Sequence, residues 1–294
     1  MNAFIKRKVR LFLGKHYPKL LVTILYRIAY GKWLDWKHPK TLNEKINWLK
    51  FNSDTSLWTI LADKYRVRDY VKSKGCGELL VKLHGIWKSP DEIDWDALPN
   101  QFVLKTNNGC GDVRICRDKG IIDREEWLNH FRKVLKEKIG YERGEPHYNK
   151  ITPPAIMAEE LLDCSKQPIK SSSLIDYKVW CFNGCPYCVF VLLNRMKKNV
   201  EIALYDTDWN PINEKLKYSS HYRPTSQNIP RPKSLHRMLQ YSSILSFDLP
   251  QSRIDFYEVD GKPYFGEITM TSAGGFMDYF TEDYLNELGD LVKL

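Results

Sequence analysis

The segment 253–275 constrains the fold most, because it predicts two short strands joined by a tight turn at Asp260-Gly261. Each strand carries a carboxylate among apolar neighbours, Asp255 on the first and Glu267 on the second. A carboxylate is costly to bury unless a positive group meets it. The pair therefore predicts either a site for a hard cation such as Mg²⁺, which binds carboxylates together with substrate phosphates, or ordinary salt bridges in a surface hairpin.

The register of this hairpin decides whether the two acids can share a cation. With a simple two-residue loop, Asp255 would pair with Gly266, and Glu267 would point to the opposite face of the sheet. A bulge, or a three-residue loop that extends to Lys262, would bring both acids to one face, and we expect one of these irregularities. Arg253 shares a strand face with Asp255, where an arginine suits negative charge spread over phosphoryl oxygens.

Charge is distributed unevenly along the 294 residues, whose net charge is +9. The first 40 residues hold ten Lys and Arg but one acid, Asp35, so this segment accounts for the whole excess. The rest of the chain is balanced. The 43% hydrophobic content of the whole sequence indicates a globular protein of one large or two smaller domains. We predict no nucleic-acid partner.

The basic N-terminal segment predicts two helices, over residues 4–13 and from Lys19 to about Tyr30. Basic amphipathic helices suit an anionic membrane surface, here through residues 1–35, but they can equally dock on the protein body with the basic side in solvent. Both interpretations are open from the sequence. The apolar face of the first helix consists of Ile5, Val9, Phe12 and Leu13.

No secretory signal and no apolar run long enough to span a bilayer is evident, so we expect a cytoplasmic protein, or one peripheral to the inner face of the membrane. The cysteines, an odd number in a chain without an export signal, indicate reduced thiols. Cys181, Cys185 and Cys188 lie close together in the sequence, but no fourth zinc ligand has suitable spacing. We expect these three to pack in or beside a strand pair.

A second candidate site lies where a predicted strand ends at Lys105. The loop that follows contains Asn108, Gly109 and Gly111, and glycines let backbone N–H groups approach phosphate oxygens closely while the lysine adds a point charge. It is not a Walker A loop, because no Gly-Lys-Ser/Thr follows. An ordinary hairpin turn is the alternative interpretation.

Five further features of the chain carry expectations. Thr41 and Glu44 form a capping box that starts a helix, and another helix covers about 61–74, with Lys64 at its start facing a ligand or solvent. A buried strand over 155–162 ends in Glu159 and Glu160. It could offer backbone groups to an adenine and a carboxylate to a ribose.

The strand 174–182 carries Asp176 and Lys178 on one face, so this lysine pairs either with that aspartate or with an anionic ligand. Asn183-Gly184 predicts a hairpin to 186–193, a central strand because it is apolar on both faces.

Seven sequence blocks occur in a recognisable order. They are Thr-Leu-Asn-Glu-Lys-Ile, Ala-Asp-Lys-Tyr, Leu-Pro-x-Gln-Phe-Val-Leu-Lys-Thr-Asn-x-Gly, Ala-Glu-Glu, Asp-Tyr-Lys-Val-Trp-Cys-Phe-Asn-Gly, Arg-Ile-Asp-Phe-Tyr and Phe-Gly-Glu-Ile-Thr. Over about residues 40–294 the chain resembles the ATP-grasp superfamily, and within it the TupA-like group typified by a teichuronopeptide biosynthesis protein. The resemblance implies an α+β fold in which two α+β subdomains grip ATP.

The resemblance also implies a domain plan. Residues 1–60 would be a basic helical region in place of a full Rossmann-like domain. Residues 61–294 would be the ATP-grasp domain, with a smaller lid-like subdomain over about 100–160.

Roles for individual residues follow from the same resemblance. Arg253 and Lys178 would act in catalysis, Arg253 by steadying the transferred phosphoryl group. Thr269 stands where the superfamily usually has Asn, and its hydroxyl can still bind metal or water. The Mg²⁺ ligands would be Asp255, Glu267 and Thr269, and the ATP contacts would come from Lys64, Lys105, Asn108, Gly109, Gly111, Glu159, Glu160, Leu162, Asp176 and Lys178.

The implied reaction is that of an ATP-dependent carboxylate–amine ligase, which forms an amide through an acylphosphate. A uronic acid of a surface polysaccharide or its precursor, joined to an amino acid or another amine, would fit the group. Two alternatives remain at this point: a kinase-like phosphotransferase acting on a glycan, and a peripheral protein that binds polyanions without catalysis.

Overall fold

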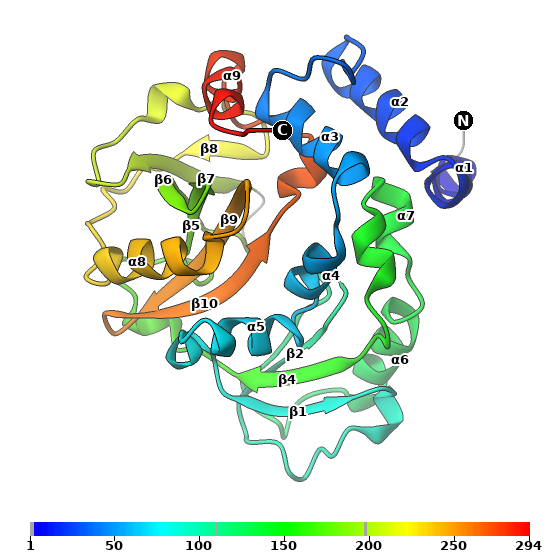
Figure 1. Ribbon diagram of the computed structural model, residues 1–294. Coiled ribbons are helices and arrows are strands. Elements are labelled where there is room, and N and C mark those ends of the chain that lie inside the picture. Colours follow the sequence, from blue (N-terminus) through cyan, green and yellow to red (C-terminus); the bar gives the residue numbers. More distant parts are fainter. Residues whose placement is uncertain (1–2, 110, 197–198) are drawn as a thin grey trace. The chain divides into compact units, whose positions relative to one another are not determined.

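The computed structural model describes residues 3–109, 111–196 and 199–294 (Figure 1). The chain divides into two compact units, each of which contains a sheet. Unit 1 comprises Met1–Val22, Asp54–Lys72 and Leu80–Leu162, and unit 2 comprises Thr23–Ser53, Ser73–Leu79 and Asp163–Leu294.

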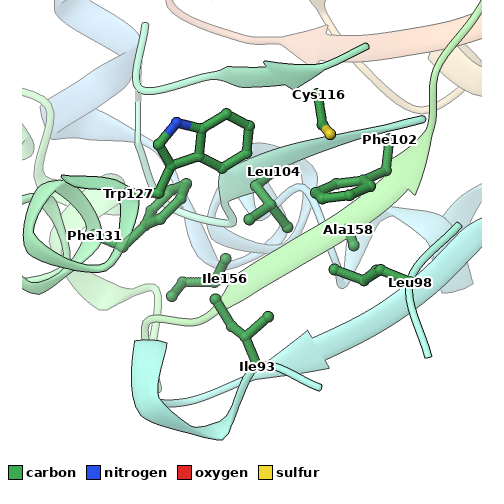
Figure 2. Packing of buried hydrophobic residues seen from close by; sticks show 9 residues of the cluster. All are labelled: Ile93, Leu98, Phe102, Leu104, Cys116, Trp127, Phe131, Ile156 and Ala158. Carbon is green, nitrogen blue, oxygen red and sulfur yellow. The ribbon is translucent and has the colours of Figure 1, made fainter. Parts of the chain in front are cut away.

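The sheet of unit 1 has the strand order β1-β4-β2-β3, with every neighbouring pair antiparallel. Its strands are β1 (Leu83–Trp87), β4 (Ile156–Glu160), β2 (Phe102–Thr106) and β3 (Arg114–Cys116). Figure 2 shows Trp127 and Phe131, from helix α6, beside Leu104 and the other apolar side chains of this core. Helix α6 (Arg124–Val134) starts after Asp123, whose side chain accepts a hydrogen bond from the N–H of Glu126.

The other helices of unit 1 correct one expectation. The single helix predicted over 61–74 is two short helices, α4 (Ser56–Ala62) and α5 (Val67–Ser73). Between them the Asp63 carboxylate accepts hydrogen bonds from the N–H groups of Tyr65 and Arg66, at 2.9 and 3.2 Å. This local bonding competes with continuation of the helix, so Lys64 lies in the break and not at a helix start.

The N-terminal helices and a short helix after α6 complete the helices seen in this part of the chain. They are α1 (Ala3–His16), α2 (Pro18–Tyr30, whose first residues belong to unit 1) and α7 (Ile139–Arg143). Short 3-10 helices lie at Gly77–Leu79, Pro90–Glu92, Pro146–Lys150, Cys164–Lys166, Asn213–Lys215 and Ser272–Gly275.

The sheet of unit 2 has the strand order β10-β9-β5-β6-β7-β8. All neighbouring pairs are antiparallel except β7–β8. The interior position of β6 confirms that the strand apolar on both faces is central, and the positive φ angles of Asn183 and Gly184 confirm the turn before it. The strands are β5 (Asp176–Phe182), β6 (Cys185–Leu193), β7 (Val200–Asp206), β8 (Tyr222–Pro224), β9 (Gln251–Val259) and β10 (Lys262–Thr269).

Three helices accompany this sheet. Helix α8 (Leu235–Ser246) packs on β5, β6 and β9, and α9 (Glu282–Asp290) packs on α3 (Leu42–Asn52). Helix α3 begins with the predicted capping box of Thr41 and Glu44. Within the described ranges, none of the helices has both the length and the apolar character that crossing a bilayer requires.

The clustered cysteines lie around the β5–β6 turn. Cys181 and Cys188 are buried, which confirms the packing expected for them, whereas Cys185 is exposed. Burial raises the pKa of both the Cys181 and the Cys188 thiol to about 12, so both stay protonated at neutral pH.

We expect native protein treated with iodoacetamide at pH 8 to be alkylated at Cys185 and to remain unmodified at Cys181 and Cys188. The physical reason is that the thiolate is the reactive form and these two thiols are buried. Tandem mass spectrometry of the peptide that contains all three residues provides the measurement, and denatured protein labelled at every site is the control. Equal labelling of Cys181 and Cys185 in native protein would contradict the burial.

Candidate functional site

The β9–β10 hairpin contains the irregularity that shared cation binding requires. Asp260 and Gly261 form the two-residue turn, with φ of 53° and 69°. Pairing then proceeds to Phe265 opposite Phe256, after which Glu267 lies opposite Asp255. Gly266 is the extra residue of a β-bulge, so the bulge predicted from the sequence is confirmed and the two acids lie opposite each other.

Lys178 joins these acids in one row across three strands. Asp255 lies on β9, between the other two strands. Lys178 of β5 is opposite it on one side, and Glu267 of β10 is opposite it on the other. The Lys178 ammonium donates to the Asp255 carboxylate, and a second, longer bond of 3.4 Å reaches Asp176. The Lys178 side chain is 8% exposed and that of Asp255 2%, so this ion pair is buried.

Arg253 ties the two acids together. Its Nε donates to Asp255 Oδ1 at 2.7 Å, and its Nη2 donates to Asp255 Oδ2 and to Glu267 Oε1, both at 2.8 Å. The same Nη2 lies 3.1 Å from the Thr269 hydroxyl. Glu267, with 43% of its side chain exposed, is the acid of this row that solvent reaches.

A residue that sequence reasoning missed completes the cluster. Arg195, just beyond the end of β6, donates from Nη1 to Asp176 Oδ2 at 2.7 Å. The signal available in the sequence was a buried aspartate in an apolar strand, which calls for a cation, but nothing local indicated which one. With Arg195 included, the cluster has three acids and three bases, so its formal charges cancel.

Burial and ion pairing oppose each other at two groups of this cluster. Burial raises the pKa of Asp255 above its ordinary value, although Arg253 and Lys178 act to lower it. Burial acts to lower the pKa of Arg253, but the attraction of Asp255 and Glu267 outweighs it and holds that pKa well above the ordinary value. The arginine therefore stays charged at neutral pH.

Helix α3 holds the loop that follows β10. Asn43 donates from Nδ2 to the Met277 carbonyl and accepts at Oδ1 from the Met277 N–H, each at 3.0 Å. Asn47 and Lys50 donate to the carbonyls of Gly275 and Gly274, each at 2.8 Å. These backbone groups are thus fixed by buried polar side chains from the Thr-Leu-Asn-Glu-Lys-Ile block and the turn after it.

The same loop carries unusual backbone conformations next to the charged cluster. Ala273, Gly274 and Gly275 all have positive φ, and a Cβ at Gly275 would lie 2.7 Å from Asn47 Nδ2. Ser272 accepts a hydrogen bond of 3.2 Å from Nη1 of Arg253. Helix α3 therefore sets the path of the chain directly beside Arg253.

Unit 1 contains a separate basic cluster around Glu159. Lys105 donates to Glu159 Oε2 at 2.5 Å, and Arg68 donates to Glu159 Oε1 at 3.0 Å and to the Val81 carbonyl at 2.7 Å. Arg68 was not among the predicted residues. Two cations around one carboxylate leave a local excess of one positive charge.

The loop after β2 is held by its own polar side chains. Asp112 accepts from the N–H of Thr106 at 2.7 Å and also from the Thr106 hydroxyl. Asn107 donates to both oxygens of Asp63 at 3.2 Å, and Lys64 donates to the Gly109 carbonyl. Asn107 and Asp112, which sequence reasoning passed over, therefore shape the loop that contains Asn108, Gly109 and Gly111.

The predicted residues thus fall into two groups, described one unit at a time. Unit 2 brings Asp176, Lys178, Arg253, Asp255, Glu267 and Thr269 together on its sheet. Unit 1 brings Lys105 beside Glu159 and Lys64 beside Gly109. Glu160 is exposed at the end of β4, with Leu162 half-buried two residues beyond it, and neither shares these ion pairs.

The donor atoms of the unit 2 cluster fit a hard cation. Asp255, Glu267 and Thr269 offer oxygen atoms alone. In the parts of the chain that the structure describes, His, Cys, Asp and Glu form no larger group, of three or more, that could hold a metal. A cation here would take two carboxylates and complete its shell with water or phosphate oxygens, which is how Mg²⁺ usually binds.

Comparison with known proteins assigns the family. The family model described as TupA-like ATPgrasp matches residues 44–293. The chain belongs to the TupA-like ATP-grasp family. The α+β ATP-grasp fold expected from the sequence is thereby confirmed, and the mixed sheets and helices of both units agree with it. No curated protein sequence matches the chain.

Several solved ligase structures show remote similarity to this ATP-grasp chain. The D-alanine–D-alanine ligase of Bacillus anthracis complexed with ATP aligns at 15% identity and TM-score 0.43, covering 79% of this chain and 63% of that one. The ATP-grasp ligase PsnB complexed with a minimal precursor aligns at 13% identity and TM-score 0.43, covering 82% of this chain and 61% of that one. The D-alanine–D-alanine ligase of Helicobacter pylori aligns at 14% and 0.44, covering 79% and 57%. The chain thus spans about three-fifths of the length of these proteins.

The two paired acids should differ in their effect on stability. We expect Asp255→Ala to lower the free energy of unfolding by about 3–5 kcal/mol, because it removes the buried carboxylate that Arg253 and Lys178 share. Glu267→Gln should cost less than about 1 kcal/mol, because that side chain is partly in solvent.

Urea unfolding followed by circular dichroism would provide the measurement. Glu287→Gln is the matched control, since Glu287 is 40% exposed and pairs with Lys215 at 2.8 Å in the same unit. Equal destabilisation by the Asp255 and Glu267 substitutions would contradict the difference in burial.

The polar contacts of α3 make a second prediction. We expect Asn47→Ala to lower the free energy of unfolding by about 1–3 kcal/mol, because the buried Gly275 carbonyl loses its donor. Asn52→Ala, which removes an exposed amide that donates to the Trp48 carbonyl on the same helix, should change it by less than about 0.5 kcal/mol. Indistinguishable urea midpoints for the two variants would show that Asn47 does not hold the loop.

Proposed function

We propose that this protein is an ATP-dependent carboxylate–amine ligase. The observation that carries the proposal is the row of Lys178, Asp255 and Glu267 across β5, β9 and β10, with Arg253 bonded to both acids. Membership of the TupA-like ATP-grasp family supports ATP as the energy source. The exposed edge of the row, at Glu267, is where a nucleotide phosphate would meet the cluster.

Asp255, Glu267 and Thr269 would hold Mg²⁺, which when bound supplies positive charge to the phosphate oxygens of ATP. Lys178 and Arg253 already neutralise these acids, so a cation that takes over the carboxylates leaves the two side chains with positive charge for the nucleotide. Arg253 would then face the negative charge that develops on the transferred group. Fixed charges of this kind act without reorganisation during the reaction.

Unit 1 would supply the remaining nucleotide contacts. Lys105 and, more weakly, Lys64 would bind phosphates, with the backbone of Asn108, Gly109 and Gly111 beside them. Because the Glu159 carboxylate already accepts from Lys105 and Arg68, we propose that it orients that lysine. Glu160 would then meet the ribose, and the backbone near Leu162 the adenine.

The chemistry would come from the substrates. A carboxylate oxygen attacks the γ-phosphorus of ATP, the bond to the β-γ bridging oxygen breaks, and ADP leaves. An amine nitrogen then attacks the carbonyl carbon of the acylphosphate, phosphate departs, and the amine proton passes to solvent. None of these steps needs a protein nucleophile, so the protein contributes position and charge.

The substrate class and cellular place rest on the family resemblance. We propose that the acid is a uronic acid of a surface polysaccharide or its precursor, and that the amine is an amino acid or a related amine. The reaction would take place in the cytoplasm, with residues 61–294 as the catalytic part and residues 1–60 as a helical addition. The segment of about 100–160 would act as the smaller, lid-like subdomain.

The proposal is tested by screening uronic acids and amino acids with ATP and Mg²⁺ and measuring phosphate release. Hydroxylamine should trap the intermediate as a hydroxamate, and the complete mixture should yield an amide. A stable phosphorylated sugar with no hydroxamate would favour the kinase-like alternative. Polyanion binding without any phosphate release would favour a protein without catalysis.

Variants test which residues carry the reaction. We expect Glu267→Gln and Arg253→Ala each to lower turnover at least about a hundredfold, the scale of losing one preorganised electrostatic group. Glu267→Gln should weaken ATP binding far less than turnover, because the metal matters most as charge develops. Glu287→Gln is the matched control and should keep full activity, and full activity in the Glu267→Gln enzyme would exclude this site.

A further inference from the structure

Helix α1 docks on its own unit through one narrow face. Gly14 packs so closely on α7 that a Cβ there would lie 1.7 Å from the Tyr141 carbonyl oxygen. Arg7 pairs with Glu142 and lies 3.7 Å from Glu137. Residues 7 and 14 are seven positions apart, two helical turns, so they mark one line along the inner side of the helix.

The apolar stripe of α1 lies on the opposite side and faces solvent. Ile5, Val9 and Phe12 are 49, 44 and 58% exposed. At about 100° per residue, Val9 falls about 140° around the helix from Gly14 and about 160° from Arg7. Of the stripe predicted from the sequence, Leu13 is half-buried, whereas the other three side chains face solvent and do not pack on the protein.

Exposed apolar residues continue beyond α1 within the same unit. Tyr17 and Leu20 are 56 and 49% exposed, and the Phe12 ring lies 6.3 Å from that of Tyr17, centre to centre. Large contiguous apolar surfaces rarely stay uncovered in a soluble monomer. Something outside the described chain should cover this one.

Basic residues flank the stripe on both sides. Helical geometry places Lys8 and Lys15 along one edge and Lys6 along the other, with Arg10 nearer the inner line, and all four are exposed. The first 40 residues contain one acid, Asp35. Two copies of this face would bring like charges together, which disfavours self-association, whereas an anionic surface complements it.

We propose that this face of α1, with Tyr17 and Leu20, is a docking surface for an anionic lipid bilayer. The helix would lie in the plane of the interface, with Ile5, Val9 and Phe12 among the upper acyl chains and the flanking lysines at the phosphates. The Gly14 contact with α7 anchors the helix to unit 1, so the protein is held at the surface without a spanning segment. This inference stands apart from the proposed ligase activity.

The test is co-sedimentation of the full chain with vesicles of phosphatidylcholine alone, or with part of it replaced by phosphatidylglycerol. Point variants are better than removal of the N-terminal segment, because the deletion would also remove the buried Leu21 and Val22. Wild-type protein should sediment with the vesicles that contain phosphatidylglycerol and stay in the supernatant with the neutral ones. Added salt should weaken the binding to the phosphatidylglycerol vesicles.

Phe12→Ser should weaken the partition at least about tenfold, the scale of losing one buried aromatic side chain. Ile121→Ser, at a side chain 81% exposed elsewhere in unit 1, is the matched control and should bind as wild type. Lys6→Glu with Lys15→Glu should abolish the preference for phosphatidylglycerol, whereas the exposed control Lys88→Glu should keep it. Equal thermal unfolding midpoints would establish that the variants are folded.

Three outcomes would overturn the proposal. One is wild-type binding that is independent of phosphatidylglycerol and of salt, which requires no variant to observe. A second is unchanged vesicle binding by folded Phe12→Ser protein. The third is a wild-type dimer in analytical ultracentrifugation that Phe12→Ser dissociates, which would make a second copy the partner of this face.

Discussion

Asp255 is a carboxylate in the interior of a sheet, and the arrangement of unit 2 around it follows from the cost of that burial. Two cations meet it, Lys178 from the strand on one side and Arg253 from its own strand. Removing either partner would leave charge in a low-dielectric environment, which is far more costly than the pair itself is stabilising. The bulge at Gly266 matters for the same reason, because it brings Glu267 opposite Asp255 and into reach of the same arginine.

The loop after β10 depends on that cluster and on α3 together. Arg253 reaches the Ser272 hydroxyl, and Asn43, Asn47 and Lys50 fix the next few backbone groups. Several hydrogen bonds from buried side chains to neighbouring carbonyl and N–H groups restrict this loop to one local geometry. The family block at the start of α3 therefore has a structural reason that does not require contact with a nucleotide.

The sequence predicted those features that follow from local rules. The turns at Asn183-Gly184 and Asp260-Gly261 are fixed by residues that tolerate positive φ, and the bulge follows from the side-chain period of two once both acids must share a face. The helix break at Asp63 was missed, because a side chain that bonds its own backbone competes with helix without changing the apolar pattern.

Long-range pairings were the other features that the sequence did not predict. Arg195 and Arg68 complete ion clusters with Asp176 and Glu159, residues far from them in the chain, and no local pattern specifies such partners. The apolar stripe of α1 was predicted as a pattern, but periodicity does not say whether protein, solvent or lipid lies against it. The structure shows that solvent lies against Ile5, Val9 and Phe12, because α1 contacts α7 through Gly14 on its opposite side.

The most direct measurement is anomalous diffraction from crystals grown with Mn²⁺ and a non-hydrolysable ATP analogue. Mn²⁺ prefers the same oxygen ligands as Mg²⁺ and can be located unambiguously by its anomalous signal. If the paired carboxylates form a cation site, a peak should lie between Asp255 and Glu267, next to the phosphates of the analogue. A structure with bound nucleotide in which Mn²⁺ lies at other residues, and in which Arg253 still bonds both acids, would contradict a cation site at these carboxylates.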